Sequence, residues 1–188
     1  MEKMFKILNA IYPMSEGLRD YIANHLKSVK LPKKHLLLKP EQVSDKMYFV
    51  ESGLLRGYYL HDGKEVTTWI MQENEIVISI LSFYTQQPAQ EYIELLEDCK
   101  LWYMSYADVQ KGYQQFMEFN FIARIFTERY YVMSEYRSFY MRMHTADERL
   151  KLLLHDFPTI LARVKQKDIA SLLGITPETL TRKLANRI

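Results

Sequence analysis

The segment 166–184 constrains the fold of this chain more than any other part of the sequence. Its first half places apolar residues at helical spacing up to Leu173, and Gly174 follows at the position where a left-handed residue ends many helices. Thr176 and Pro177 then form a typical helix start, in which threonine caps the helix and proline occupies its first turn. The segment therefore predicts two helices joined by a tight turn.

The second of these predicted helices has one apolar face and one polar face. Leu180 and Leu184 are spaced to contact the first helix, and Ile175 can form a hydrophobic staple with Leu180. On a polar face, arginine can bond guanine, glutamate can accept from cytosine, and threonine can contact a phosphate or a thymine methyl group. We therefore predict a DNA-binding helix-turn-helix whose contact residues are Thr176, Glu178, Thr179, Thr181, Arg182 and Lys183.

The positive charge of the chain is concentrated around this segment. Between residues 163 and 188 six lysines and arginines stand against two acidic residues, so the local net charge is +4, whereas the whole chain carries +2. A basic end attracts phosphate groups even in a nearly neutral protein. Two alternatives stay open at this point, namely a solvated basic surface and an ordinary pair of packed helices without DNA contacts.

Residues 119–143 carry a heptad pattern, because apolar or aromatic residues fill seven of the eight positions reached by alternating steps of three and four. A helix of this length would outreach a small β-domain, so we expect it to pair with the same helix of a second subunit. The alternative is a long helix that packs on its own domain. The predicted dimer interface residues are Phe119, Ile122, Phe126, Met133, Tyr136 and Tyr140.

Before this helix, residues 31–105 show short apolar runs separated by turn residues, a pattern typical of β-strands. Asp62 and Gly63 form the strongest hairpin signal, because both tolerate the positive φ that a tight turn requires. Residues 5–27 instead show helical spacing, interrupted near Pro13. The expected strands are residues 35–38, 47–50, 54–60, 66–71, 76–80, 92–95 and 101–104.

These patterns predict an α+β protein in three parts. Residues 1–117 are expected to form an antiparallel β-roll, a double-stranded β-helix or jelly roll, with flanking helices. Residues 118–144 are expected to form the long dimerisation helix. Residues 145–188 are expected to form the helix-turn-helix domain, in which Thr145 and Glu148 can make a capping box at the first helix.

This order of parts resembles the CRP/FNR family of bacterial transcription regulators over nearly the whole chain. The residues that carry the resemblance are Met-Tyr-Phe-Val-Glu-Ser-Gly-Leu-Leu-Arg at 47–56, Asp-Gly at 62–63, the strand at 97–105 and the segment 168–184. In that family the recognition helix commonly carries a Glu, then a Ser or Thr and an Arg, matched here by Glu178, Thr181 and Arg182. The resemblance implies a cyclic-nucleotide-binding-like sensor domain, a homodimer on double-stranded DNA, and RNA polymerase as a further partner.

The sequence departs from those members of the family that bind cyclic AMP. Such members use a Glu for the ribose hydroxyl and an Arg for the cyclic phosphate, and Ser79 and Ala89 occupy the corresponding positions here. No lysine or arginine lies between Lys64 and Lys100 to replace the charge-assisted phosphate contact. We therefore expect no binding of cyclic AMP or cyclic GMP in the usual mode, although another small molecule could occupy the roll.

The sequence disfavours other classes of protein. Cys99 is the only cysteine and the five histidines are scattered, so we expect no metal, no cofactor and no enzymatic activity. Charged residues near the amino end exclude a signal peptide, and no segment is apolar enough to cross a membrane, which indicates a cytoplasmic protein without membrane contact. We therefore predict a homodimeric, sequence-specific DNA-binding transcription regulator. The alternative is an effector-binding or protein-interaction module whose helix-turn-helix does not bind DNA.

Overall fold

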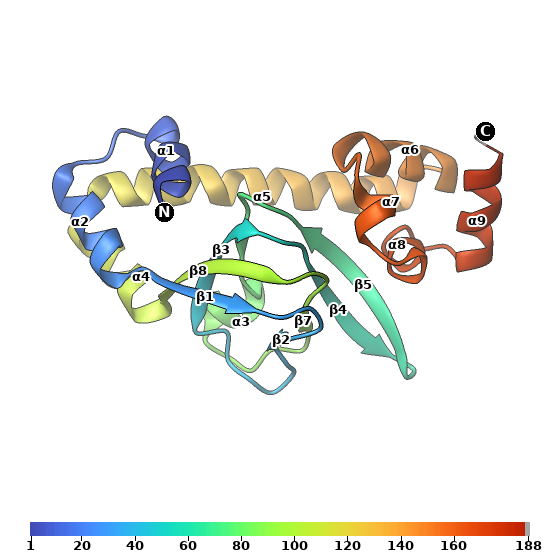
Figure 1. Cartoon of the computed structure of the whole chain (residues 1–188), viewed down its shortest axis with the longest axis horizontal. Coiled ribbons are helices and arrows are strands. Elements are labelled where there is room, and N and C mark those ends of the chain that lie inside the picture. Colours follow the sequence, from blue (N-terminus) through green and yellow to red (C-terminus); the bar gives the residue numbers. More distant parts are fainter. Residues whose placement is uncertain (187–188) are drawn as a thin grey trace.

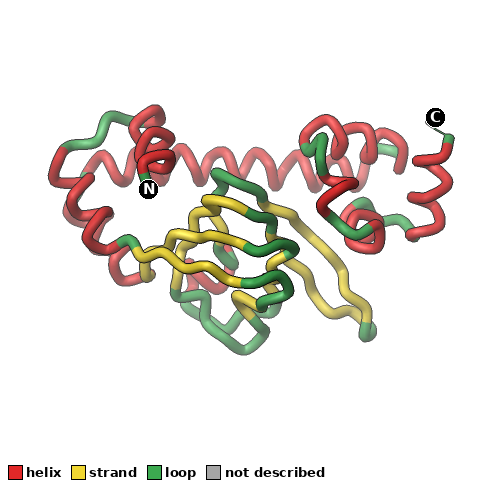
Figure 2. The backbone as a smooth tube through the Cα atoms, viewed as in Figure 1, coloured by secondary structure: helices red, strands yellow, loops and turns green. Residues whose placement is uncertain are grey.

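The computed structural model describes residues 1–186, and one long helix organises them. This helix, α5 (Met117–Met143), runs along the molecule, with a β-roll against its middle and other helices near both of its ends (Figure 1). The strands are confined to the central part, as Figure 2 shows. Within the described part of the chain, no helix combines the length and the apolar character that a membrane span requires.

The roll consists of two four-stranded sheets in which all paired strands are antiparallel. The first sheet has the order β1 (Lys27–Leu31), β8 (Cys99–Ser105), β3 (Lys46–Ser52) and β6 (Ile76–Val77). The second has the order β2 (Leu36–Leu38), β7 (Tyr92–Leu95), β4 (Leu55–His61) and β5 (Lys64–Met71). At the β4–β5 turn, Asp62 and Gly63 have φ angles of 50° and 73°, which confirms the predicted hairpin. The predicted α+β class and β-roll are therefore confirmed.

Two segments of the roll differ from the expected strands. Residues 27–31 form β1 and pair with β8, although their sequence follows directly on the helical pattern. The sequence also predicts a strand over residues 76–80, but only Ile76 and Val77 are extended, and a short helix, α3 (Ile80–Thr85), follows. A short apolar run does not distinguish strand from helix, and burial of the Phe83 ring in the core favours the helical turn here.

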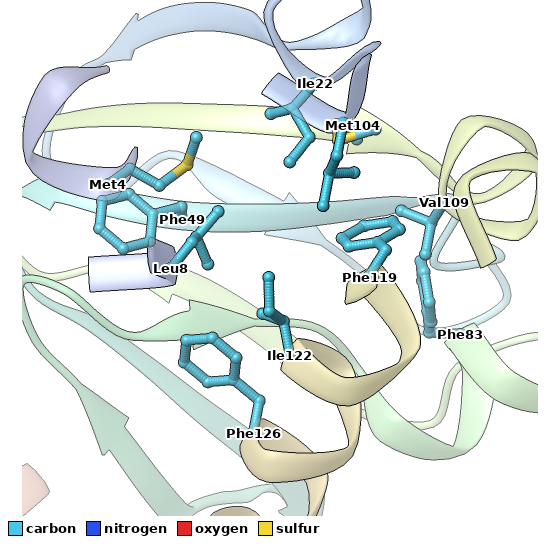
Figure 3. Packing of buried hydrophobic residues seen from close by; sticks show 11 residues of the cluster. Met4, Leu8, Ile22, Phe49, Phe83, Met104, Val109, Phe119, Ile122 and Phe126 are labelled. Atoms are coloured by element: carbon cyan, nitrogen blue, oxygen red, sulfur yellow. The ribbon is translucent and has the colours of Figure 1, made fainter. Parts of the chain in front are cut away.

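Three further helices hold α5 against the roll, namely α1 (Glu2–Ile11), α2 (Glu16–His25) and α4 (Tyr106–Gln115). Ser15 and Ser105 cap α2 and α4, because their hydroxyl oxygens accept backbone N–H groups of the first turn. The apolar faces of these helices join Phe119, Ile122 and Phe126 of α5 in one core (Figure 3). The first third of α5 is therefore an internal element of this chain.

Among the described residues four helices follow α5; the first, third and fourth match predicted helices, whereas the second was not predicted. They are α6 (Ala146–Asp156), α7 (Ile160–Arg163), α8 (Gln166–Leu172) and α9 (Pro177–Ala185). Thr145 caps α6 in a capping box with Glu148, as the sequence predicts. Gly174 has a φ angle of 64° after α8, and Thr176 accepts the backbone N–H of Thr179 at the start of α9. Local sequence signals therefore specify three of these four helices.

A second apolar core joins these helices to the roll. Leu150 of α6, Ile169 of α8 and Leu180 of α9 are completely buried. The same cluster contains Leu54, which lies just before β4, and Ile70 of β5. Burial of apolar side chains from both sides stabilises the position of α8 and α9 relative to the roll.

Candidate functional site

The turn between α8 and α9 holds the two helices in a fixed relation. The backbone N–H of Gly174 donates to the Ser171 carbonyl at 3.0 Å, and the N–H of Ile175 donates to the Ala170 carbonyl at 3.0 Å. This pattern is typical of a helix end with a left-handed residue. Because Leu180 is fully buried on the inner side of α9, the opposite side of that helix faces outward.

The six residues predicted to contact DNA differ in their exposure. Glu178, Thr181 and Arg182 are exposed, and hydrogen bonds from its own backbone N–H and from Thr176 lower the pKa of Glu178, so this side chain is anionic at neutral pH. Thr176 is also exposed but uses its hydroxyl as the α9 cap, and Thr179 is half-buried behind it. Four of the six residues therefore share the outer surface of the start and middle of α9.

Lys183, the sixth of these residues, points elsewhere. Its Nζ atom lies 2.7 Å from Oδ2 of Asp147 at the start of α6, and its side chain is only 19% exposed. The ion pair holds α9 against α6. We therefore remove Lys183 from the outward-facing set, because its side chain is largely buried against α6.

The local positive charge is also smaller at the surface than the sequence indicates. Arg163 and Lys167, which contribute to the +4 count, are ion-paired with acidic residues of the roll. Together with Lys183, three of the six cations are thus neutralised by partners outside the segment. Arg182 and Lys165 make no ion pair with any residue from 1 to 186, whereas the sixth cation, at position 187, lies outside the described residues.

A buried arginine of the roll connects it to α8. Arg56 of β4 is only 3% exposed, and its Nη1 atom lies 2.6 Å from Oδ1 of the equally buried Asp168. The same guanidinium donates to Oε2 of Glu94 at 2.6 and 2.8 Å and to Oε2 of Glu65 at 2.7 Å. Its planar fork therefore holds three carboxylates, two from the roll and one from the C-terminal helices. The aromatic face of Tyr58 lies 4.3 Å away.

The pKa values of this cluster reflect burial and pairing together. Burial by itself lowers the pKa of Arg56, but hydrogen bonds to Glu65 and Glu94 outweigh it and raise the pKa. Burial raises the pKa of Asp168, although the attraction of Arg56 acts in the opposite direction. Because Asp168 lies 112 residues from Arg56 in the chain, no local sequence pattern reveals this pair.

A second ionic contact joins α7 to the roll. Arg163 binds Glu73 and Glu97 with a bidentate geometry toward each carboxylate, at distances of 2.6 to 3.1 Å. The hydrogen bond from Arg163 is the main cause that lowers the pKa of Glu73 to about 2. Beside Arg56, the backbone N–H of Thr67 in β5 donates to Oγ of Ser171 in α8 at 2.9 Å. The C-terminal helices are thus fixed to the roll by polar as well as apolar contacts.

The predicted dimer interface residues of α5 fall into a buried group and an exposed group. Phe119, Ile122 and Phe126 are buried in the core of their own chain and point toward the roll and α1 (Figure 3), so they cannot form a subunit interface. Met133 and Tyr136 are 40% and 55% exposed. The outer part of α5, residues 131–143, exposes further large apolar side chains, which are Tyr131, Val132, Phe139, Met141 and Met143.

The roll and α5 enclose a cavity of about 540 Å³. Its walls are mainly apolar and aromatic, and they include Trp69 of β5, Tyr84 of α3 and Tyr130 of α5. Two charged side chains reach it, Glu91 from the roll and Arg137 from α5. Sequence reasoning missed Arg137, because it searched for a cation only within the roll.

Ser79 and Ala89, which correspond to the cyclic AMP-binding Glu and Arg of the family, are not among the residues that line this cavity. Ser79 and Ala89 are buried, and the backbone N–H of Ala89 donates to the Gln42 carbonyl at 2.8 Å. Arg137 donates through Nη1 to the Thr68 carbonyl at 3.1 Å, and burial lowers its pKa. Ala89 has no group that could bind a phosphate, so any charged contact in the cavity depends on other residues.

Other reactive groups within the described residues do not form a site. Cys99 is buried, and that burial raises the pKa of its thiol to about 11, so the reactive thiolate is scarce at neutral pH. Among residues 1–186 no three histidine, cysteine or acidic side chains gather in a way that could hold a metal ion.

Comparisons with known proteins agree with this architecture. Residues 28–116 match the family of cyclic nucleotide-binding domains. FixK2 from Bradyrhizobium japonicum is 18% identical, with 86% of this chain and 83% of that chain covered and a TM-score of 0.75. A Eubacterium rectale protein assigned to the crp/fnr family of transcriptional regulators is 18% identical, with 94% and 87% covered and a TM-score of 0.72.

A third similar structure is the c-di-GMP responsive global regulator Clp of Xanthomonas campestris. It is 17% identical, with 92% of this chain and 91% of that chain covered and a TM-score of 0.69. No curated protein matches the chain significantly. At these identities the similarity concerns the fold, which extends over the roll, the long helix and the C-terminal helices.

Proposed function

We propose that this chain is a transcription regulator that binds specific DNA sequences as a homodimer. Residues 28–116 match the cyclic nucleotide-binding domain, and the chain has the fold of CRP/FNR regulators, which supports this proposal. The observation that carries the proposal is the outward face of α9, where Glu178, Thr181 and Arg182 are exposed while Leu180 anchors the helix. An exposed arginine and glutamate on the second helix of such a pair can read guanine and cytosine in the major groove.

Each of the three parts of the chain has its own proposed role. Residues 1–117 act as the sensor domain, 118–144 as the dimer helix and 145–188 as the DNA-binding domain. The apolar side chains exposed on the outer part of α5 support dimerisation, because a row of such side chains is costly in water. Met133, Tyr136 and Tyr140 remain the central residues of the proposed interface. The related structures belong to regulators, which supports a role without catalysis.

Cyclic AMP and cyclic GMP are not the proposed signals. Ser79 and Ala89 supply neither the carboxylate nor the guanidinium of the usual mode, and Glu91 places an acidic group at the cavity. An anionic cyclic phosphate next to a buried carboxyl group would meet repulsion. Calorimetry should therefore detect no micromolar binding of either nucleotide.

Selection from random DNA duplexes tests the DNA-binding role directly. The full chain should enrich a pseudo-palindromic motif with half-sites about one helical turn apart, and its affinity should fall steeply as salt rises. Arg182→Ala should relax specificity at one base position and weaken specific binding by about 1–3 kcal/mol. Arg19→Ala is the matched control, because Arg19 is exposed on α2 near the opposite end of α5 (Figure 1).

The alternative, an interaction module without DNA binding, predicts different results. No motif would be enriched, and any association with DNA would be weak and independent of sequence. If Arg182→Ala keeps the affinity and the motif of the wild type, Arg182 does not contact the bases, even if the chain binds DNA.

A further inference from the structure

The cavity between the roll and α5 contains a buried carboxyl group without a cationic partner. Glu91 is only 6% exposed, and its Oε2 atom accepts a hydrogen bond from Nε1 of Trp69 at 3.0 Å. The Ser79 hydroxyl is its other polar neighbour, and no ion pair joins Glu91 to any residue from 1 to 186. An isolated carboxylate in such a place is unfavourable, and burial accordingly raises the pKa of Glu91.

The other charged group of the cavity does not neutralise Glu91. Arg137 donates to the Thr68 carbonyl, and its main attractive partner is Glu75. Glu75 in turn accepts the backbone N–H of Gln72 at 2.7 Å. Because Arg137 is attracted mainly to Glu75 and makes no ion pair with Glu91, the negative charge of Glu91 is uncompensated when it is ionised.

The walls near Glu91 are suited to a positively charged group with an apolar body. The phenol ring of Tyr59 lies close enough to Glu91 for the carboxyl charge to raise its pKa, after the larger effect of burial. Trp69 and Tyr130 add further aromatic surface, and aromatic faces attract cations. A volume of about 540 Å³ lies within the range of pockets that hold small organic ligands.

The cavity also has an entrance. Leu81 and Tyr84 of α3 and Tyr131 of α5 line it and are 73%, 48% and 66% exposed. These side chains connect the apolar interior with the solvent. A small molecule can therefore reach the cavity without opening of the roll.

We propose that this cavity binds an apolar organic amine, with the ammonium group paired to the Glu91 carboxylate and the hydrocarbon part between the aromatic walls. The ligand supplies the counter-charge that the protein lacks at this position. Binding would fix the distance between β5 and α5. This inference rests on the proposed function in one respect: the amine is the signal only if the roll acts as the sensor domain of a regulator.

The test compares two ligands of similar size and opposite charge, 2-phenylethylamine and 3-phenylpropionate. Binding can be followed by the fluorescence of Trp69 in a Trp102→Phe background, because the chain has two tryptophans and only Trp69 lines the cavity. We expect the amine to bind at least about tenfold more tightly than the acid, since a hydrogen-bonded charge pair in an apolar site contributes at least that factor.

Two variants assign the preference to Glu91. Glu91→Gln retains an acceptor for Trp69 and should remove the preference for the amine, whereas Glu128→Gln on the exposed side of α5 should leave it unchanged. Ala123→Phe fills part of the cavity and should weaken binding of both ligands. Thermal unfolding of each variant shows whether it is folded.

The proposal is overturned if the acid binds as tightly as the amine, if Glu91→Gln retains the preference, or if neither ligand binds at millimolar concentration. The proposed DNA-binding function is judged separately by duplex selection on the same protein. Amine binding without an enriched DNA motif would contradict the regulator role alone, and an enriched motif without amine binding would contradict the ligand proposal alone.

Discussion

Replacement of Arg56 by methionine should destabilise the contact between the roll and the C-terminal helices more than any exposed substitution. Methionine has a similar length but cannot bind a carboxylate. The change leaves Asp168, whose side chain is 4% exposed, with only the distant and exposed Lys167, at 3.9 Å, as a counter-charge. Glu94 and Glu65 are 18% and 37% exposed and retain part of their hydration. Removal of one partner from a buried pair costs about 3–5 kcal/mol, and we expect a loss in this range.

A double variant separates the pair from simple packing. Arg56→Met combined with Asp168→Leu removes the buried carboxylate as well and should recover a large part of the lost stability, because apolar residues can replace a buried ion pair at little net cost. Arg124→Met is the control, since its pair with Glu128 lies on the surface of α5 and should contribute no more than about 1 kcal/mol.

Urea unfolding of the wild type, Arg56→Met, Asp168→Leu, the double variant and Arg124→Met measures these differences in the free energy of unfolding. A loss below about 1 kcal/mol in Arg56→Met would show that the Arg56–Asp168 pair does not hold the two parts together. A double variant whose loss equals the sum of the two single losses would show that the two side chains are not coupled.

Three other residues, Glu73, Met133 and Gly174, give independent predictions. Glu73 has a folded-state pKa of about 2, below its ordinary 4.5, so its stabilisation is present above about pH 4.5 and is lost as the pH falls toward 2. Glu73→Gln should therefore reduce the loss of unfolding free energy on acidification by about 1–2 kcal/mol, a range that allows for solvent screening of a side chain that is 31% exposed. An unchanged dependence of the unfolding free energy on pH would contradict this. Met133→Glu should give monomers in sedimentation and weak DNA binding, because it places a charge among the exposed apolar side chains of α5, and persistent dimers would place the interface elsewhere. Gly174→Ala should lower the unfolding free energy by about 1–2 kcal/mol, because Gly174 has a φ angle of 64° and the added Cβ would lie 2.8 Å from Met141. If the variant unfolds at the same temperature as the wild type, the turn is not strained.

Features set by neighbouring residues could be predicted from the sequence. The Asp62–Gly63 hairpin, the Thr145 capping box and the Gly174 turn each depend on interactions within a few residues. The change from strand spacing to helical spacing located the boundary between the roll and the long helices, apart from α3. These features were enough to identify the fold and the position of α8 and α9.

Features set by distant residues could not be predicted. The sequence shows Arg163 as a basic residue near the proposed DNA-binding segment, but the fold brings Glu73 and Glu97 to it. The same holds for Arg137, which reaches the cavity from α5. A heptad pattern likewise does not reveal which of its residues face the same chain, so the burial of Phe119 became apparent only in the structure.

The continuity of α5 gives the molecule a lever. Its 27 residues extend over about 40 Å at 1.5 Å per residue, and one end is fixed in the core beside the cavity while the other joins the C-terminal helices. A tilt of about 5° at the fixed end displaces the far end by about 3.5 Å, which is close to the rise of one base pair along DNA. Because Arg56 and Arg163 tie the C-terminal helices to the roll, a displacement of this size would break those ion pairs before it moved α9.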